Sequence, residues 1–442
     1  MTTGPNYNTM TSLDKPLSPE EVEYLSFEGG GGKGNAFLGA IRALEDHMIL
    51  RVENGLPAGI KGISGASAGA ITAMLLGTGH SSLDIANILK ADFEDFFDGP
   101  DPSMVFKPGT RMNFVPNKPA LSRFLIEKEH LVNTLLHMIP VVPDWILRWL
   151  LKSFIMDDGQ SLRDKIESSE WHANFLRTEP VYKVRLLNQI MANLGDFRDS
   201  VFMDFGIFNG MKIHYFFNHV VDMKMRPDPK KKLIDWSSSF QYTHDARVKW
   251  WTMKEVVDKF GIDLKFTAVN FRTGNVQILS RDTTPNLPIA TAVRMSMSLP
   301  LIFKPVLIDR VFADQIVPPQ DRADAGKIWE GLWVDGGYFD NAPIRVFPGE
   351  SALLFRLGPR AEDNTLTNFG HYMSTYLKLG LFGSGAGQVT KTSYQYNKHI
   401  IQLDVTGTDL LKFNMTPAEQ AELMRKNQKI VTDYFKEAKA GK

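Results

Sequence analysis

The chain has 442 residues with equal numbers of acidic and basic side chains, a formal net charge of zero and 43% hydrophobic residues. It is long enough to bury a large core, and its balanced charge argues against a nucleic-acid partner. The absence of cysteine excludes disulfides, thiolate metal sites and a cysteine nucleophile, and it fits folding in a reducing compartment. We therefore expect a cytoplasmic globular protein.

The first 20 residues are predicted to be a flexible arm. Gly, Pro, Asn, Thr and Ser are frequent in this segment, and it lacks the apolar stretch of a secretory signal peptide. We expect no signal peptide and, at most, peripheral contact with a membrane.

Strand and helix patterns alternate in the next part of the chain. Residues 22–27 form a short apolar strand candidate, and residues 35–50 carry apolar side chains at helical spacing. Residues 59–64 and 68–76 repeat this order of strand and helix. The alternation predicts an α/β fold with a mostly parallel central sheet, whose sites form at the carboxyl ends of strands.

Between about residues 92 and 251 the pattern is lost, and we expect a large insertion that forms a cap over the site. Further strands are predicted at residues 264–270, 276–280, 332–334, 352–357 and 399–403. A closing helix is predicted over about residues 416–439, because Thr416 and Glu419 form a capping box. One catalytic domain, residues 21–442, contains all of these elements.

Residues 131–156 are the most apolar part of this insertion. Prolines interrupt them, so they do not form a transmembrane span. Their second half predicts a helix with one narrow polar stripe, in which Trp145, Trp149 and Phe154 are candidates for membrane or lid contact. A core helix with one solvated stripe explains the same pattern, and both interpretations stay open.

A candidate nucleophile lies in the pattern Gly65-x-Ser67-x-Gly69. On a tight turn from strand to helix, small residues on either side of a serine let the backbone bend sharply and leave its hydroxyl exposed. Ser67 fits this pattern better than Ser64. A run of small residues without function is the alternative.

The glycine run at residues 29–32, followed by Lys33 and Gly34, can form an anion-binding turn at a helix N-terminus. Such a turn serves either phosphate binding or stabilisation of an oxyanion. Phe27 stands where a P-loop requires its first glycine, and Gly34 stands where it requires Ser or Thr, so nucleotide binding is disfavoured.

Asp335 ends the apolar run at residues 332–334 and is followed by Gly336 and Gly337. A carboxylate in such a place can act as the base for a serine when burial and hydrogen bonding tune its pKa. A turn capped by its own aspartate is the alternative. Asp314 is a weaker rival because no glycines follow it.

These elements, in this order, resemble the patatin-like phospholipase family, whose members are lipid acyl hydrolases. The resemblance implies an oxyanion hole at Gly29, Gly30 and Gly31 and a Ser-Asp dyad of Ser67 and Asp335, with motif support from Gly34, Gly65, Gly69 and Gly336. Residues 292–300 and 341–343 also resemble family segments, although Met295 stands where the family usually has alanine.

The family implies a three-layer patatin-type fold and a serine lipid acyl hydrolase of phospholipase A or lysophospholipase type. It implies a phospholipid or other acyl-lipid substrate and no metal or cofactor. Two alternatives stay open: an effector or toxin that a host factor or other unknown partner activates, and a lipid-binding module without catalysis.

Overall fold

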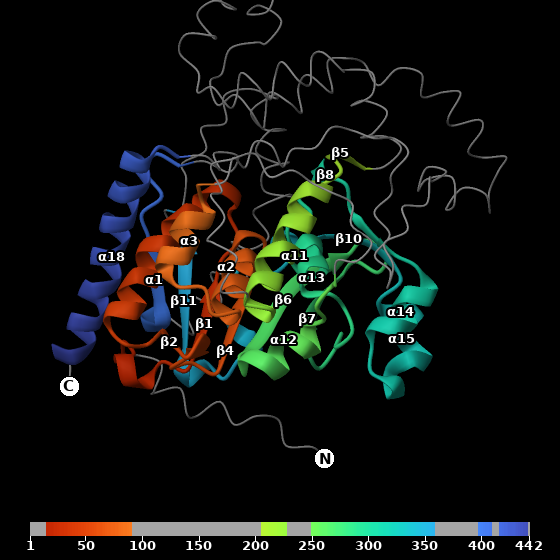
Figure 1. Ribbon diagram of the computed structural model, residues 1–442, viewed down its shortest axis with the longest axis horizontal. Coiled ribbons are helices and arrows are strands. Elements are labelled where there is room, and N and C mark those ends of the chain that lie inside the picture. The colour runs from red at the N-terminus through yellow and green to blue at the C-terminus, as the bar shows by residue number, and fades with distance from the viewer. Residues whose placement is uncertain (1–14, 91–204, 228–248, 359–396, 409–414, 441–442) are drawn as a thin grey trace, which may run out of the picture.

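The computed structural model describes residues 15–90, 205–227, 249–358, 397–408 and 415–440, and its main element is an eight-stranded sheet (Figure 1). The strands of this sheet are β1 (Tyr24–Phe27), β4 (Gly62–Gly65), β6 (Asp263–Asn270), β7 (Asn275–Ser280), β9 (Val306–Ile308), β10 (Gly331–Asp335), β11 (Ala352–Leu357) and β12 (Ile400–Leu403). The predicted strands 264–270, 276–280, 352–357 and 399–403 match β6, β7, β11 and β12 to within a residue.

The parallel part of the sheet has the order β12-β11-β1-β4-β6. Strands β10 and β7 both pair with β6 in antiparallel direction, and β9 pairs with β10 in the same way. The α/β fold with a mostly parallel sheet is therefore confirmed. The antiparallel direction of β10, the strand that ends in Asp335, does not follow from the alternation of strands and helices.

The helices cover this sheet and both of its ends. They are α1 (Phe37–Asp46), α2 (Ala68–Gly77), α3 (Ser82–Ile88), α11 (Met211–Met225), α12 (Met253–Phe260), α13 (Ile289–Ser296), α14 (Arg310–Ile316), α15 (Arg322–Ile328) and α18 (Pro417–Ala440). Helix α18 packs along α1 at one end, and α14 packs with α15 at the other (Figure 1). The prediction of a closing helix is confirmed, and Glu419 N donates to Thr416 Oγ1 at 3.3 Å as the capping box requires.

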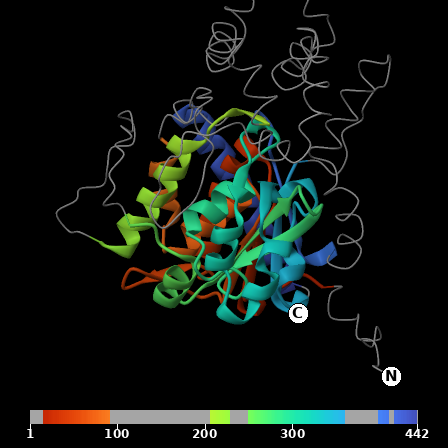
Figure 2. The same cartoon turned by 90° about the vertical axis from the view of Figure 1, so that its right-hand side faces the viewer.

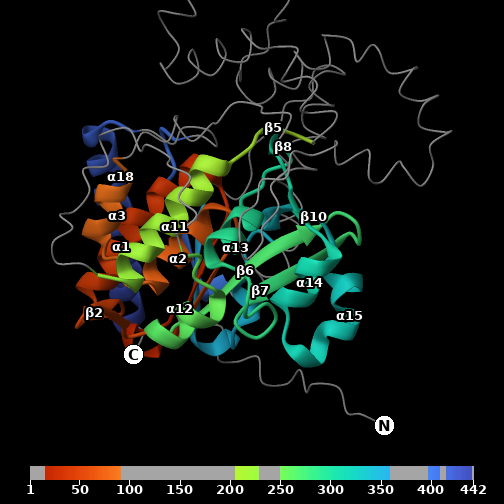
Figure 3. The ribbon, with the colours of Figure 1, turned by 45° about the vertical axis from the view of Figure 1, so that its right-hand side comes forward.

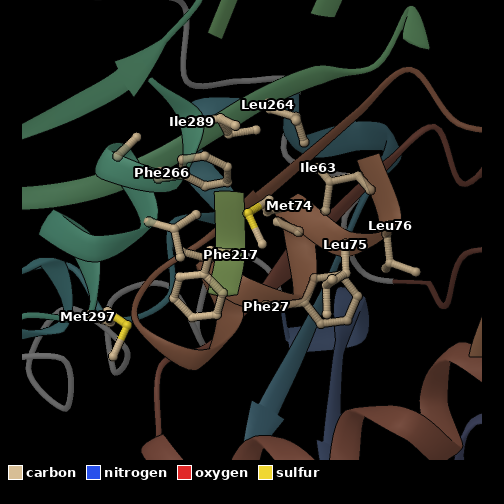
Figure 4. Close-up of a cluster of buried hydrophobic side chains, with 14 of the residues drawn as sticks. Phe27, Ile63, Met74, Leu75, Leu76, Phe217, Leu264, Phe266, Ile289 and Met297 are labelled. Carbon is tan, nitrogen blue, oxygen red and sulfur yellow. The ribbon is translucent and has the colours of Figure 1, made fainter. Parts of the chain in front are cut away.

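The main core lies between the sheet and the layer that contains α1, α2, α11 and α13. Phe27, Ile63 and Phe266 from three neighbouring strands meet Met74 of α2 and Phe217 of α11 (Figure 4). A smaller cluster around Ile344 and Phe347 covers the opposite face of β1 and β11. Burial on both faces explains why these central strands are mostly apolar.

Helix α11 lies inside the stretch expected as an insertion, but it belongs to the core layer. Phe217 and Val221 are fully buried, and α11 lies to one side of the sheet (Figure 2). The later part of the stretch 92–251 therefore supplies a structural helix. The larger part of it, residues 91–204 and 228–248, lies outside the described residues.

The arm expected over the first 20 residues is docked at its end. Leu17 is 2% exposed, and its main-chain N donates to the hydroxyl of Tyr434 on α18 at 2.9 Å. Ser18 and Pro19 are also buried. Tertiary burial of Leu17 overrides the polar local composition, while residues 1–14 lie outside the described part.

Two small sheets complete the described structure. Strands β2 (Arg51–Glu53) and β3 (Leu56–Ala58) form an antiparallel hairpin, and β5 (Gly206–Phe208) pairs in parallel with β8 (Leu301–Phe303) at the edge of the molecule near β10 (Figure 3). None of the helices in the described ranges is long and apolar enough to cross a membrane.

Candidate active site

Ser67 lies on a sharp turn between β4 and α2. Its φ of 52° and ψ of −120° put a non-glycine residue in a rarely populated region, which costs about 1–3 kcal/mol and is typical of functional turns. A Cβ on Gly65 would lie 2.2 Å from the carbonyl of Gly69, and one on Gly69 would lie 2.0 Å from the carbonyl oxygen of Phe27. The turn therefore closes only with glycine on both sides of Ser67, which stays partly exposed.

Ser64, the alternative serine, is buried and its hydroxyl bonds to neighbouring chain segments. Its side chain is fully buried on β4, and its hydroxyl lies 3.0 Å from both Ser26 Oγ and the carbonyl oxygen of Pro343. It has no exposed hydroxyl to offer a substrate, so the local geometry favours Ser67 as the candidate nucleophile.

The register of β6 brings Asp335 to Ser67. Strand β7 follows one edge of β6, so β4 and β10 share its other edge. On that edge Gly65, the last residue of β4, pairs with Phe266, and Asp335, the last residue of β10, pairs with Ala268. The two strands approach from opposite directions and end almost head to head. The turn that carries Ser67 therefore meets the end of β10.

Asp335 is 2% exposed, and hydrogen bonding compensates only in part for the burial of its carboxyl group. Its Oδ1 accepts a hydrogen bond from Gly337 N at 2.7 Å, whereas Oδ2 has no partner of normal geometry among the described residues. Burial raises the pKa of Asp335 from 3.8 to about 7, against a lowering effect of the Ser67 hydroxyl and of Gly337 N. The carboxyl group can thus exchange a proton near neutral pH, with Oδ2 free to receive it.

The end of α13 holds both candidate residues in place. Ser67 N donates to Ser296 Oγ at 3.0 Å, and Asp335 N donates to the carbonyl oxygen of Ser298 at 2.9 Å. Ser296 and Ser298 are fully buried. Spacing in the sequence gave no sign of these contacts, and only the resemblance of residues 292–300 to a family segment pointed at this part of the chain.

Arg294 anchors this end of α13. It is fully buried, and its guanidinium donates to the carbonyl oxygens of Asn209, Gly210 and Lys304 at 2.9, 3.2 and 2.9 Å and to the hydroxyl of Ser298. The planar guanidinium carries five N–H donors, so one side chain can tie three chain segments together. The arginine therefore supports the site without being placed among its reacting groups.

The glycine loop runs from the end of β1 into the 3-10 turn η3 (Gly31–Ala36). Gly29 N donates to the carbonyl oxygen of Asn341 at 3.0 Å, so its amide is already used. Within the described residues, no acceptor is recorded for the amides of Gly30, Gly31 and Gly32. Gly31 has a φ of 53°, in the left-handed region that favours glycine. The loop therefore offers amides for an anion, but Gly29 is not among the free ones.

Two other motif glycines are required by close packing. A Cβ on Gly34 would lie 2.9 Å from the Cβ of Ala68, so the glycine loop touches the first turn of the helix after Ser67. A Cβ on Gly336 would lie 2.1 Å from the carbonyl oxygen of Thr267. The glycine loop is thus packed against the turn of Ser67, and the turn after Asp335 is packed against β6.

Asp314 does not join this cluster. Asp314 lies on α14, where its carboxylate is 3.4 Å from Arg310, and no contact with Ser67 is recorded. The candidates for membrane or lid contact, Trp145, Trp149 and Phe154, lie outside the described residues.

The chain is similar to a family model, to a curated viral protein and to solved structures. A family model described as Patatin-like phospholipase matches residues 25–348. Uncharacterized protein R571 of Acanthamoeba polyphaga mimivirus is 36% identical over 78 residues, which are 18% of this chain and 24% of that protein.

Solved structures align over most of this chain at low identity. VipD from Legionella pneumophila aligns with a TM-score of 0.43 and 17% identity, over 94% of this chain and 67% of that one. ExoU in the ExoU-SpcU complex of Pseudomonas aeruginosa aligns with a TM-score of 0.32 and 15% identity, over 95% of this chain and 52% of that one. This chain spans about half the length of ExoU and about a quarter of the viral protein.

Proposed function

The chain belongs to the patatin-like phospholipase family, and we propose that it hydrolyses fatty-acyl esters of membrane lipids through a dyad of Ser67 and Asp335. The observation that carries this proposal is the meeting of a strained serine turn with a buried carboxyl group whose pKa is raised to about 7. A base with a pKa near the working pH combines a useful charged fraction with the ability to hold a proton.

In the first half of the reaction Ser67 Oγ attacks the acyl carbonyl carbon, and its proton passes to Asp335 Oδ2. The carbonyl oxygen becomes an oxyanion. When the tetrahedral intermediate collapses, the ester bond breaks, and the leaving alcohol takes the proton from Asp335. The acyl group then remains on Ser67.

In the second half a water molecule attacks the acyl-enzyme and gives a proton to Asp335. Collapse of this second intermediate releases the fatty acid, and Ser67 Oγ takes the proton back. One carboxyl group thus serves both steps. Its pKa near 7 supports this double role, because a group that is always ionised could not return the proton efficiently.

The oxyanion is stabilised by main-chain amides of the glycine loop. The family pattern names Gly29, Gly30 and Gly31, but the amide of Gly29 already donates to Asn341. We therefore assign the donor role to Gly30 and Gly31 and keep Gly29 as a packing position. Removing a donor of this kind typically costs about 100-fold or more in kcat.

The test uses the full-length chain, vesicles of phosphatidylcholine and a soluble short-chain ester. Wild type should release fatty acid from both substrates, and a fluorophosphonate should label Ser67. Ser67→Ala should keep the melting temperature of wild type and lose both release and labelling. Release that continues unchanged in Ser67→Ala would exclude this mechanism, and wild type that is neither active nor labelled would favour a lipid-binding module.

A further inference from the structure

Asn341 and Gly29 are joined by two hydrogen bonds, although they are 312 residues apart in the sequence. Gly29 N donates to the carbonyl oxygen of Asn341 at 3.0 Å, and Asn341 Nδ2 donates to the carbonyl oxygen of Gly29 at 3.1 Å. Both polar main-chain groups of Gly29 are therefore held by a single residue. This residue follows Asp335 closely in the chain.

The other atom of the Asn341 amide lies between two loops. A Cβ on Gly29 would lie 2.3 Å from Asn341 Oδ1, and a Cβ on Gly337 would lie at the same distance from it. Gly337 N in turn donates to Asp335 Oδ1 at 2.7 Å. The side chain of Asn341 thus fills the space between the glycine loop and the turn that holds the carboxyl group of Asp335.

The main chain around Asn341 is fixed by contacts that do not involve its side chain. Thr267 Oγ1 donates to the carbonyl oxygen of Asp340 at 3.1 Å, and Ser64 Oγ donates to that of Pro343 at 3.0 Å. These bonds tie the chain before and after Asn341 to strands β6 and β4. A shorter side chain at position 341 should therefore leave this segment in place while it removes one of the two hydrogen bonds that hold the glycine loop.

We infer that Asn341 is a positioning residue that clamps the glycine loop to the turn after Asp335. It sets the distance from the amides of Gly30 and Gly31 to Ser67, and so keeps the oxyanion site in register with nucleophile and base. The inference rests on the proposed function for its effect on rate, but the clamp itself is a property of the fold. Asn341 acts through the loop and does not touch the reacting atoms.

The first test replaces Asn341 by Ala in the full-length chain. Asn286→Ala is the matched control, because Asn286 Nδ2 also donates to a carbonyl oxygen, that of Gln315 at 2.9 Å, and has no recorded contact with the three site motifs. With the soluble ester, Asn341→Ala should lower kcat by about 100-fold, as a misplacement of about 1 Å can, while KM changes by less than about threefold. Asn286→Ala should change neither.

Asn341→Asp separates the hydrogen bond from the shape of the side chain. An aspartate carboxylate fills the same space but cannot donate to the carbonyl oxygen of Gly29, so it should lower kcat about as much as alanine does. Asn341→Asp also keeps the test of kcat possible if Asn341→Ala melts far below wild type. Wild-type kcat in a folded Asn341→Asp would overturn the inference, because filling the space would then be sufficient.

Amide hydrogen exchange tests the clamp without reference to activity. Peptides that cover residues 28–36 should exchange faster in Asn341→Ala and in Asn341→Asp than in wild type or Asn286→Ala, because the loop has lost the hydrogen bond from Asn341 Nδ2 and keeps only the main-chain bond. Unchanged exchange in both variants would overturn the inference even if the protein is an active hydrolase. If wild type is inactive and Ser67 is not labelled, the proposed reaction fails, and the exchange rates still decide whether the clamp exists.

Discussion

Two glycine-rich turns build the candidate site, and their glycines have different reasons to be there. In the turn around Ser67, a Cβ on Gly65 or Gly69 would lie 2.2 or 2.0 Å from main-chain atoms. In the glycine loop, a Cβ on Gly30 would lie 2.6 Å from Leu357 Cδ1, which is the end of a side chain. The main-chain atoms of a packed strand or helix cannot move without shifting that element, whereas the end of a side chain can rotate away.

The two turns also differ in whether their main-chain amides have acceptors. Ser67 N donates to Ser296 Oγ, and Gly69 N donates to the carbonyl oxygen of Ala66 at 2.7 Å. In the described residues the amides of Gly30 and Gly31 have no recorded acceptor. Glycine in the first turn is thus a requirement of folding, and we propose that glycine in the second is a requirement of binding an anion. A substitution should therefore damage stability in one turn and rate in the other.

Gly69→Ala should have the largest effect. The new methyl group would collide with the carbonyl oxygen of Phe27, so β1 or α2 must shift, and we expect a loss of more than about 3 kcal/mol in the free energy of unfolding. Thermal and urea unfolding measure this. Gly274→Ala is the control: its φ is 69° and no atom lies within 4 Å of its Cβ position, so it should lose only about 1 kcal/mol. Similar losses in both variants would contradict the comparison.

Asp335→Asn should abolish activity and raise stability. We expect kcat to fall by about 10⁴-fold, as for other residues of such catalytic groups. Because burial raises the pKa of Asp335 in the folded state from 3.8 to about 7, the folded state binds the proton more tightly than the unfolded state does. The wild type therefore loses stability as pH rises from about 4 to about 7, and the loss is complete above that range.

Melting curves across this pH range give the measurement. Asp335→Asn should lack this loss and should be more stable than wild type above pH 7 by up to a few kcal/mol. Asp314→Asn, a change of the same kind on α14, should keep the loss that Asp335 causes. Wild-type activity should rise with pH around a midpoint near 7, since the base must be ionised before attack. If Asp335→Asn follows the wild-type melting curve at every pH, the carboxyl group is not desolvated as described.

Local pattern predicted most of the central elements correctly. Alternation, helical spacing and a capping box identified the elements that became β1, α1, α2, β6, β11 and α18, because each of these signals depends on neighbours in the sequence. The patterns around Ser67 and Asp335 also pointed to the turns that the structure brings together. These are cases in which local chemistry and tertiary structure agree.

The contacts that the sequence did not predict join residues that lie far apart in the chain. Nothing local reveals that β10 runs antiparallel along the same edge of β6 as β4, although this pairing is what brings Asp335 to Ser67. Gly29 was predicted as an oxyanion donor, yet its amide is taken by Asn341, 312 residues away. The partner of a main-chain amide is set by the folded structure and not by the residue that carries it.

Gly30→Ala should show the opposite pattern to Gly69→Ala, with a large loss of rate and a small loss of stability. Its methyl group would meet Leu357 Cδ1, which can move, so we expect less than about 1 kcal/mol of destabilisation but a loss of about 100-fold in kcat as the loop amides shift. Steady-state kinetics with a soluble ester and thermal melting measure the two effects. Gly55→Ala, where no atom lies within 4 Å of the Cβ position, is the control for activity; its φ of 78° alone should cost about 1 kcal/mol of stability.

A second substitution shows whether the collision causes the loss in Gly30→Ala. Adding Leu357→Ala removes the atom that the new methyl group would meet, so the double variant should recover part of the lost kcat. If Leu357→Ala restores nothing, the methyl group acts on the substrate and not on the position of the loop.

Ser296→Ala should have the smallest effect of the four, because it removes one acceptor and leaves the turn sterically intact. Ser67 N would lose its partner at 3.0 Å, and the strained φ of 52° would be less firmly held, so we expect a loss of about tenfold in kcat with little change in KM. Ser280→Ala is the matched control, since Ser280 is also buried and its Oγ accepts from Asp282 N and Thr283 N at 3.2 Å. Both variants should lose about 1 kcal/mol of stability, but only Ser296→Ala should slow the reaction and fluorophosphonate labelling. Equal kcat in the two variants would mean that the turn holds Ser67 by its glycine packing alone, so that folding and catalytic geometry are set by the same contacts.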